Sequence, residues 1–215
     1  MPCYEARDGA GDIRFCDEER EVTKMKIKEL DQGEWLNPPL SASLDADGFT
    51  ISAKEKSDFW QKTSYGFIYN SGHALLNEFP QDSAIEASWI LDYRHQFDHA
   101  GLIAYSDETH WIKAGIEFAD GKPQLGAVVT REISDWSVAP VPAWMDQEVH
   151  IRFSRTGDAL TIRAKCKEEW QLVRLAPLDP LRSWKVGIFC CSPLREGLKV
   201  RFTKLLSGPS DNSLH

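Results

Sequence analysis

The stretch EVHIRFSRTGDALTIRAKC, residues 148–166, alternates apolar and polar side chains with a period of two. Val149 and Ile151 alternate with polar neighbours up to a turn predicted at residues 155–158, and the alternation resumes at Leu160. Two such runs joined by a short turn indicate an antiparallel hairpin with one buried face and one face in water. The stretch therefore predicts an all-β fold.

The same period continues toward the C-terminus. Strands are predicted over residues 170–175, 186–189 and 198–203, again with alternate positions apolar. The polar positions of these strands and of the hairpin give one sheet a basic outer face, formed by Arg152, Arg163, Lys165, Lys199 and Arg201. Such a face is either an anion-binding surface or a solvated β-face. We expect a solvated face, because the water side of a sheet needs charged side chains.

The segment WIKAGIEF, residues 111–118, has two unlike faces. One face is apolar, and the other carries Trp111, Lys113 and Glu117. Upstream, one face of another predicted strand carries Trp89, Leu91 and Tyr93. Aromatic surface mixed with a few charges suits a ligand cleft. A long loop or the N-terminal segment covering these rings would explain the pattern equally well.

The sequence predicts one domain, over residues 25–206. Residues 1–24 are polar and charged without sustained periodicity, so we expect a disordered arm there, although a short helix over residues 22–30 fits the pattern as well. Residues 207–215 predict a disordered tail. No repeat and no Gly/Ser-rich or Pro-rich linker divides the sequence between them.

Composition and charge exclude several classes of partner. With 42% hydrophobic and 27% charged residues, the 215-residue chain has the composition of an ordinary globular protein. The net charge of −8 argues against nucleic acid and anionic membranes, since both are bound by concentrated positive charge. The first twenty residues lack the apolar core of a signal peptide, and no apolar run approaches the ~20 residues that span a bilayer. Five cysteines, an odd number, favour free thiols in a reducing compartment, so we expect the cytoplasm.

A series of short motifs carries a resemblance to a known family. In order, they are WLNPP at 35–39, SDFW at 57–60, YGF at 65–67, FDHAGL at 97–102, WIKAGIEF at 111–118, VVT at 128–130, SDWS at 134–137 and CSP at 191–193. Together they resemble the regulation-of-enolase family, a group of concanavalin A-like domains of largely unknown function, over about residues 30–206. The resemblance implies a concanavalin A-like jelly-roll sandwich of two antiparallel sheets, one of them concave, a cytoplasmic setting and a link to glycolytic regulation. It also implies glutamine at the position of His99, and this departure removes the amide donor from that position.

Sandwiches of this type include glycosidases, which need two carboxyl groups about 5–10 Å apart. The sequence has no run of acids with the E-x-D-x-x-E spacing that would bring such groups together on one strand. A pair from separate strands is the remaining arrangement, with Glu117 partnered by Asp98 or Glu86. The acids alone therefore do not predict an enzyme, and we expect none.

Metal and redox chemistry find little support in the sequence. His95 and His99 lie in a predicted loop without an H-E-x-x-H or C-x-x-C pattern, and Asp45-Ala46-Asp47-Gly48 predicts a turn. The vicinal pair Cys190 and Cys191 ends a predicted strand, where core packing is favoured over redox activity. We expect neither a metal nor a cofactor.

Binding is the function that these residue types favour. Flat aromatic rings stack on sugar C–H faces while polar groups orient the hydroxyls. The candidate ligand-binding residues are Trp60, Tyr65, Asp98, His99, Trp111, Lys113, Glu117, Thr130, Asp135 and Trp136. Structural roles suit Asp58, Trp60, Asp135 and Trp136 equally well, with an aspartate capping a turn and a tryptophan filling the end of the sandwich.

The sequence thus predicts a non-catalytic domain that binds a carbohydrate or small metabolite in the cleft of the concave sheet. The first alternative is an intracellular protein-interaction regulator of carbohydrate metabolism, bound to a metabolic enzyme through an exposed apolar patch. The second alternative is a sugar-active enzyme that uses cross-strand carboxylates.

Overall fold

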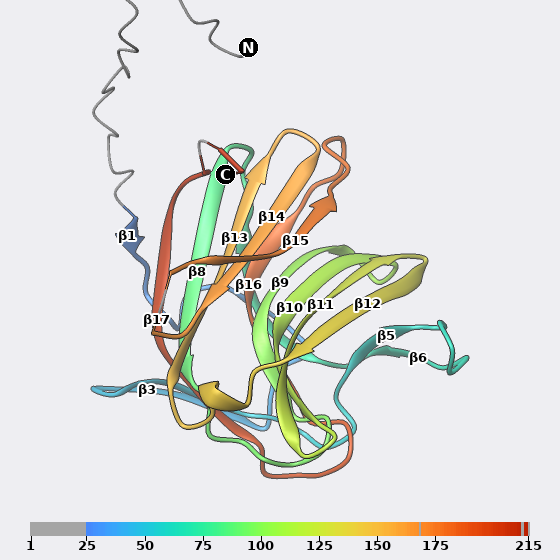
Figure 1. The fold of residues 1–215 in the computed structure, drawn as a ribbon, viewed down its shortest axis with the longest axis vertical. Coiled ribbons are helices and arrows are strands. Elements are labelled where there is room, and N and C mark those ends of the chain that lie inside the picture. Colours follow the sequence, from blue (N-terminus) through green and yellow to red (C-terminus); the bar gives the residue numbers. More distant parts are fainter. Residues whose placement is uncertain (1–24, 168, 212, 215) are drawn as a thin grey trace, which may run out of the picture.

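In a computed structural model that describes residues 25–167, 169–211 and 213–214, two antiparallel β-sheets pack face to face (Figure 1). A separate two-stranded hairpin projects beside one of them. Those described ranges contain no α-helix and one short 3-10 turn, η1 (Pro142–Trp144). The predicted all-β sandwich is therefore confirmed.

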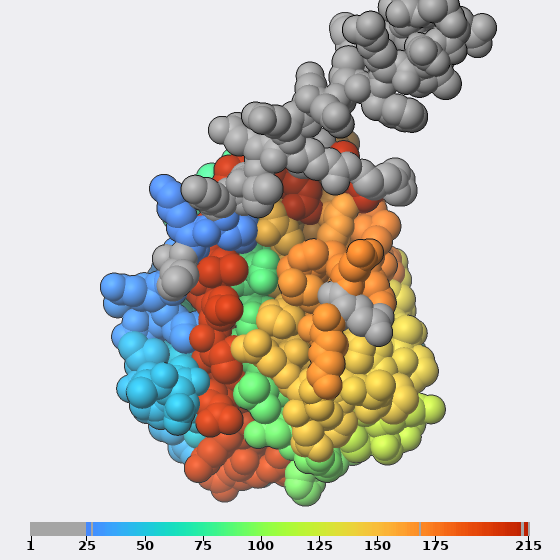
Figure 2. Space-filling view, turned by 60° about the vertical axis from the view of Figure 1, so that its left-hand side comes forward, coloured from blue at the N-terminus to red at the C-terminus, as the bar shows by residue number. Residues whose placement is uncertain are grey.

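The eight-stranded sheet has the order β15-β14-β13-β8-β17-β4-β3, with β1 paired to β17. Its strands are β1 (Lys26–Ile27), β3 (Ser41–Asp45), β4 (Gly48–Ser52), β8 (Ser83–Ile90), β13 (Glu148–Thr156), β14 (Ala159–Lys165), β15 (Gln171–Pro177) and β17 (Lys199–Pro209). Figure 2 shows the outer face of this sheet, where the red stripe of β17 separates the N-terminal strands from β8 and β13. Strands far apart in the sequence are thus neighbours.

The seven-stranded sheet has the order β12-β11-β10-β9-β16-β7-β2. Its strands are β2 (Glu34–Leu36), β7 (His73–Glu78), β9 (His99–Asp107), β10 (His110–Ala119), β11 (Lys122–Arg131), β12 (Ile133–Pro140) and β16 (Lys185–Cys191). The long strands β9–β12 curve toward the hairpin of β5 (Phe59–Gln61) and β6 (Ile68–Asn70) (Figure 1). This sheet is concave on the side that faces the hairpin.

The hairpin predicted from residues 148–166 is present as β13 and β14. Phe153 lies opposite Ile162 across the pair, and both side chains are buried between the sheets. Arg152 lies opposite Arg163 on the outer face. Period-two patterning therefore identified both the strands and their buried side.

The main core fills the space between the sheets. Its largest buried side chains include Ile51, Trp89, Leu91, Leu102, Ile112, Ile116, Phe153 and Phe202. Apolar side chains from alternate strand positions of both sheets meet there, which is the expected packing of a sandwich.

Trp89, Leu91 and Tyr93 belong to this core, so of the two interpretations left open the ligand cleft does not apply to them, and the opposite sheet covers their rings. The reason is that β8 lies in the eight-stranded sheet, and its inward face meets the other sheet rather than the concave side. The Tyr93 hydroxyl donates to the carbonyl of Ile116 across the core at 2.7 Å. Burial and this hydrogen bond explain an aromatic residue with a polar tip at that position.

The ends of the domain differ from expectation where the structure describes them. The predicted arm, residues 1–24, lies outside the described residues, and Lys26–Ile27 pairs with β17 instead of forming part of a helix. β17 continues to Pro209, into the predicted tail. Asp211 then binds Arg152 and Arg163, so the outer basic face holds the chain beyond β17. None of the described residues forms a helix long and apolar enough to span a membrane.

Candidate functional site

The concave face of the seven-stranded sheet carries the predicted second face of β10. Ile112, Ala114 and Ile116 point into the main core, whereas Trp111 and Lys113 point to the concave side. Alternation along one strand thus separates the residues of the fold from those of the site.

Strand register brings distant polar residues together on this face. Glu117 of β10 pairs directly with His99 of β9, and His99 pairs in turn with Cys191 of β16. Lys113 lies four residues before Glu117 on the same side of β10, opposite Val128 of β11. The register therefore brings Glu117, His99 and Lys113 to one patch of the sheet.

A row of three glycines crosses the sheet between Lys113 and Glu117. Gly126, Gly115 and Gly101 are consecutive cross-strand partners on β11, β10 and β9. A Cβ on Gly101 would lie 2.1 Å from the carbonyl oxygen of Ala114, so the backbones approach too closely for any other residue. A recess of about 20 Å³ lies over Gly115 and Gly126.

The β5–β6 hairpin covers part of the concave face. Phe59 packs against Trp111 and Phe189, with ring centroids 5.8 and 6.4 Å away. Trp111 is fully buried by this contact, so a hairpin covers its ring, as one of the two interpretations of the sequence expected. Among the described residues, the hairpin covers Trp111 through Phe59.

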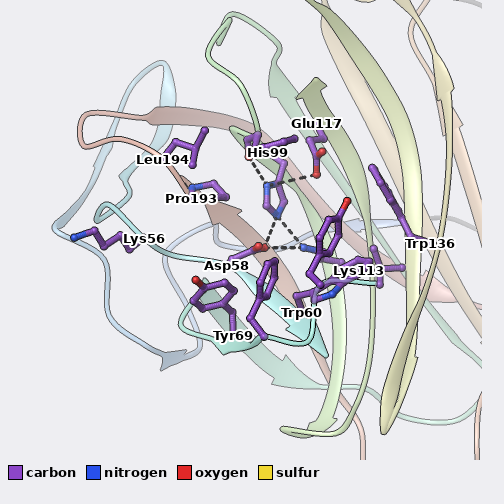
Figure 3. Close-up of a pocket in the computed structure, with 14 residues that line it drawn as sticks. Lys56, Asp58, Trp60, Tyr69, His99, Lys113, Glu117, Trp136, Pro193 and Leu194 are labelled. Atoms are coloured by element: carbon purple, nitrogen blue, oxygen red, sulfur yellow. Dashed lines mark hydrogen bonds and ion pairs between the residues drawn. The ribbon is translucent and has the colours of Figure 1, made fainter. Parts of the chain in front are cut away.

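An open pocket of about 380 Å³ lies beside the covered part, between the hairpin and the sheet (Figure 3). Its lining residues are Lys56, Asp58, Trp60, Tyr65, Phe67, Tyr69, Phe97, His99, Lys113, Glu117, Val128, Trp136, Pro193 and Leu194. Tyr65, Phe67 and Tyr69 form a continuous row of rings along the hairpin, with centroids 5.2 and 4.8 Å apart. Trp60 meets Trp136 of β12 edge-on at 6.2 Å.

Lys113 organises the polar floor of this pocket. Its ammonium donates to Asp58 Oδ1 at 3.2 Å and to His99 Nε2 at 2.9 Å. Because an ammonium can only donate, Nε2 must accept, and the His99 proton therefore lies on Nδ1. That proton is donated to the carbonyl of Phe97 at 2.8 Å. His99 is thus a neutral imidazole with both ring nitrogens bonded.

The protonation of His99 and Glu117 follows from their surroundings. Burial, helped by the charge of Lys113, lowers the pKa of His99 to about 4. Burial also raises the pKa of Glu117 to about 7, against the opposing effect of Lys113. The nearest titratable group to Glu117 is the neutral His99, whose Nδ1 lies 3.9 Å from Oε2 and already donates to Phe97.

Asp58, His99 and Cys191 offer ligand atoms within 4.8 Å of one another, which raises the question of a metal. The Nε2 lone pair and Asp58 Oδ1 are already bound by the Lys113 ammonium. Burial also holds the pKa of the Cys191 thiol well above its usual range, which disfavours the thiolate that binds zinc. The cluster does not fit a metal, because a lysine provides its positive charge.

The structure brings together six of the ten candidate residues. Those that line the pocket are Trp60, Tyr65, His99, Lys113, Glu117 and Trp136. Trp111 and Thr130 are buried beneath the hairpin, where the Thr130 hydroxyl contacts that of Ser134 at 2.8 Å.

The two remaining candidates, Asp98 and Asp135, serve ion pairs outside the pocket. Asp98 is fully buried and accepts from Arg195 Nε at 2.9 Å. Asp135 lies on the surface of β12 and pairs with Arg174. Asp98 therefore is no cross-strand partner for Glu117, and Glu86 lies in the eight-stranded sheet with Arg152.

Several lining residues were absent from the sequence-based set. Asp58 has the appearance of a turn residue, and it does accept the backbone N–H of Phe59, but the same oxygen binds Lys113. Phe67 and Tyr69 continue the alternation begun at Tyr65, a period-two pattern that signals one aromatic face on the hairpin.

The vicinal cysteines lie on opposite faces of β16. Cys190 packs in the main core and Cys191 in the smaller apolar cluster under the hairpin, and both are fully buried. This is the core packing that the sequence favoured, with two apolar clusters in place of one.

Comparison with known proteins identifies the family. Residues 35–209 match a family model described as "Protein of unknown function (DUF1349)". "Regulation of enolase protein 1" of Saccharomyces cerevisiae is 38% identical over 196 residues, which covers 90% of this chain and 98% of the yeast protein. A crystal structure of a functionally unknown protein from Saccharomyces cerevisiae aligns with a TM-score of 0.80 and 36% identity, covering 86% of this chain and 100% of that one. The resemblance drawn from the motifs is confirmed.

Solved structures with much lower identity share the fold. A xylan beta-1,4-xylosidase from Bacillus halodurans C-125 aligns with a TM-score of 0.63 at 15% identity, over 85% of this chain and 38% of that chain. A legume lectin-like domain from Entamoeba histolytica aligns with a TM-score of 0.57 at 8% identity, over 83% of this chain and 90% of that chain. At these identities the likeness shows the fold alone, and it confirms the predicted concanavalin A-like sandwich.

Proposed function

This chain belongs to the DUF1349 family, and we propose that it binds a carbohydrate or sugar-derived metabolite in the pocket between the β5–β6 hairpin and the concave sheet. The observation that carries the proposal is the convergence of aromatic rings on a polar floor (Figure 3). Rings give flat apolar surface for sugar C–H faces, and the carboxyl groups of Asp58 and Glu117 give acceptors for hydroxyls. A volume of about 380 Å³ suits a small ligand.

Binding without turnover fits the state of the polar groups. Asp58 is held by the Lys113 ammonium, and His99 lies between Asp58 and Glu117 with both nitrogens engaged. A glycosidase needs one carboxylate free to act as nucleophile or base and another as acid. Asp58 is not free in that sense, which supports a binding role.

The first test is calorimetric titration with a panel of monosaccharides, disaccharides and sugar phosphates. Trp136→Ala, which removes an exposed ring of the pocket, is expected to weaken binding of any hit at least about tenfold. Trp170→Ala is the matched control, because that ring lies on the eight-stranded side against Lys165 and His150. An absence of binding throughout the panel would refute the proposal.

A second candidate function is docking of a metabolic enzyme. Exposed apolar side chains cluster at the hairpin, where Tyr65, Ile68 and Tyr69 are 59%, 55% and 41% exposed. A patch of this kind can bind a protein as well as a sugar, and one relative is named for enolase regulation. A pull-down that compares Ile68→Asp with wild type tests this function. If the variant loses a protein partner but still binds sugar, docking is favoured.

A cytoplasmic location goes with either function, because buried Cys190 and Cys191 are free thiols.

A further inference from the structure

Glu117 is a pocket-lining acid whose carboxyl is bonded to no donor among the described residues, and the charge of Lys113 only partly offsets the cost of its burial. In the part of the chain that the structure describes, its carboxyl accepts no hydrogen bond, and the nearest titratable group is the neutral His99, with Nδ1 3.9 Å away. The Glu117 side chain is 20% exposed, and it faces the pocket (Figure 3). A carboxylate so far removed from water is costly unless a cation or several donors meet it.

The basic side chains at the pocket floor are already hydrogen-bonded to groups other than Glu117. Lys113 donates to Asp58 and His99, and the proton of His99 Nδ1 is used by Phe97. His99 is neutral, so it offers no positive charge. Neither floor cation is therefore bonded to Glu117, which leaves its carboxyl open to a group supplied by a ligand.

The walls of the pocket favour a cation in that position. Tyr65, Phe67, Trp60 and Trp136 surround the space with aromatic rings. Ring faces carry partial negative charge and attract ammonium groups, most strongly where water is excluded. Aromatic walls around an incompletely compensated carboxyl are a combination that binds organic cations.

We propose that the ligand of this pocket carries a protonated amine, which pairs with Glu117 while the rest of a polyhydroxylated ring stacks on the aromatic walls. An amino sugar is the simplest molecule of this class. The inference rests on the proposed function, and it narrows that function from sugars in general to sugars with a free amine.

Binding of an amine ligand to Glu117 should release a proton, which can be measured. With a pKa of about 7, Glu117 is mostly protonated at about pH 6. Binding of an ammonium ligand converts the carboxylic acid to a carboxylate, and its proton goes to the buffer. A neutral sugar requires no such release.

The experiment compares three probes on one ring: methyl glucoside, glucosamine and N-acetylglucosamine, in which an amide replaces the amine. Titration calorimetry at about pH 6 in two buffers of different ionisation enthalpy measures affinity and protons released. We expect glucosamine to bind about tenfold more tightly than the two neutral probes, with release approaching one proton. Glu117→Gln is expected to bring the affinity ratio to about one and to abolish the release.

Glu78→Gln is the matched control, since it removes a carboxylate from the same sheet outside the pocket. Glu78→Gln should leave the affinity ratio of glucosamine to the neutral probes, and the proton release, as in wild type. Equal affinities for all three probes with no proton release would overturn the amine inference and leave sugar binding standing. If none of the three binds, the amine inference fails, and the wider panel of saccharides and sugar phosphates decides the sugar proposal.

Discussion

At the scale of the residue, His99 and Glu117 respond to pH in opposite directions. Burial lowers the pKa of His99 from 6.5 to about 4 and raises that of Glu117 from 4.5 to about 7. Unfolded protein binds the His99 proton more readily, so His99 makes stability rise between pH 4 and 6.5. Folded protein keeps the Glu117 proton more readily, so Glu117 makes stability fall between pH 4.5 and 7. Each effect amounts to about 3 kcal/mol, and the two largely cancel.

His99→Gln should reveal the contribution of Glu117. The glutamine oxygen can still accept from Lys113, but the side chain no longer titrates. Urea unfolding of this variant, followed by tryptophan fluorescence, should show stability falling from pH 4.5 to 7 relative to wild type, in which the His99 contribution offsets that of Glu117. The double variant His99→Gln/Glu117→Gln shows how the remaining titrating groups change the free energy of unfolding with pH. Parallel curves for the single and double variants would contradict the assignment.

At the scale of the element, the β5–β6 hairpin is held on the sheet by buried polar contacts as well as by Phe59. The backbone N–H of Gln61 donates to Ser134 Oγ at 3.0 Å, and the Gln61 amide donates to the carbonyl of Glu108 at 2.8 Å. These bonds fix Trp60, the neighbouring residue, as a pocket wall. The pocket therefore depends on the hairpin being seated.

Ser134→Ala should loosen this seating. It leaves the Gln61 N–H buried without its partner, at a cost of about 1–3 kcal/mol in the free energy of unfolding. Ligand affinity should fall as well, because Trp60 loses its fixed position. Ser137→Ala on the same strand removes an exposed hydroxyl bonded to Arg174 and should change stability by less than about 0.5 kcal/mol. Equal effects of the two variants would show that the contact does not seat the hairpin.

The two-faced strand at residues 111–118 was predictable, because alternation on a strand depends on neighbours two positions apart. The hairpin over it was not. Phe59 and Trp111 are in contact although they lie far apart in the sequence, and Asp58 binds Lys113, which lies 55 residues further along the chain. Sequence pattern identifies which face of a strand is polar, but not which loop covers it. For this reason Trp111 was taken for a ligand contact and Asp58 for a turn residue.

At the scale of the whole molecule, the chain beyond β17 closes onto the eight-stranded sheet. Asp211 accepts from Arg152 Nε at 2.9 Å and also pairs with Arg163, and the backbone N–H of Asp211 donates to Ser154 Oγ. These arginines were expected to face water as solubilising charges. Their positions on the outer face were predictable, but their partner was not, since it lies 59 residues from Arg152 in a polar stretch with no periodicity.

Asp211→Asn should destabilise the fold by about 1–3 kcal/mol, because it leaves two mostly buried arginines without their shared carboxylate. Asp146→Asn breaks an exposed pair with Arg94 and should cost less than about 0.5 kcal/mol. The midpoint of urea unfolding measures both. Sugar binding should persist in Asp211→Asn, since its contacts lie on the opposite sheet. A midpoint unchanged from wild type would mean that the closure adds no stability.

The glycine row of Gly126, Gly115 and Gly101 has a consequence for how the pocket can change during evolution. Close backbone approach at these positions accompanies the bend of the sheet that carries β12 toward the hairpin. A substitution at Gly115 would force the strands apart and alter the gap between Trp60 and Trp136, even though Gly115 itself forms no wall of the main pocket. Ligand size in descendants of this protein can therefore shift through backbone curvature while every aromatic contact residue stays the same.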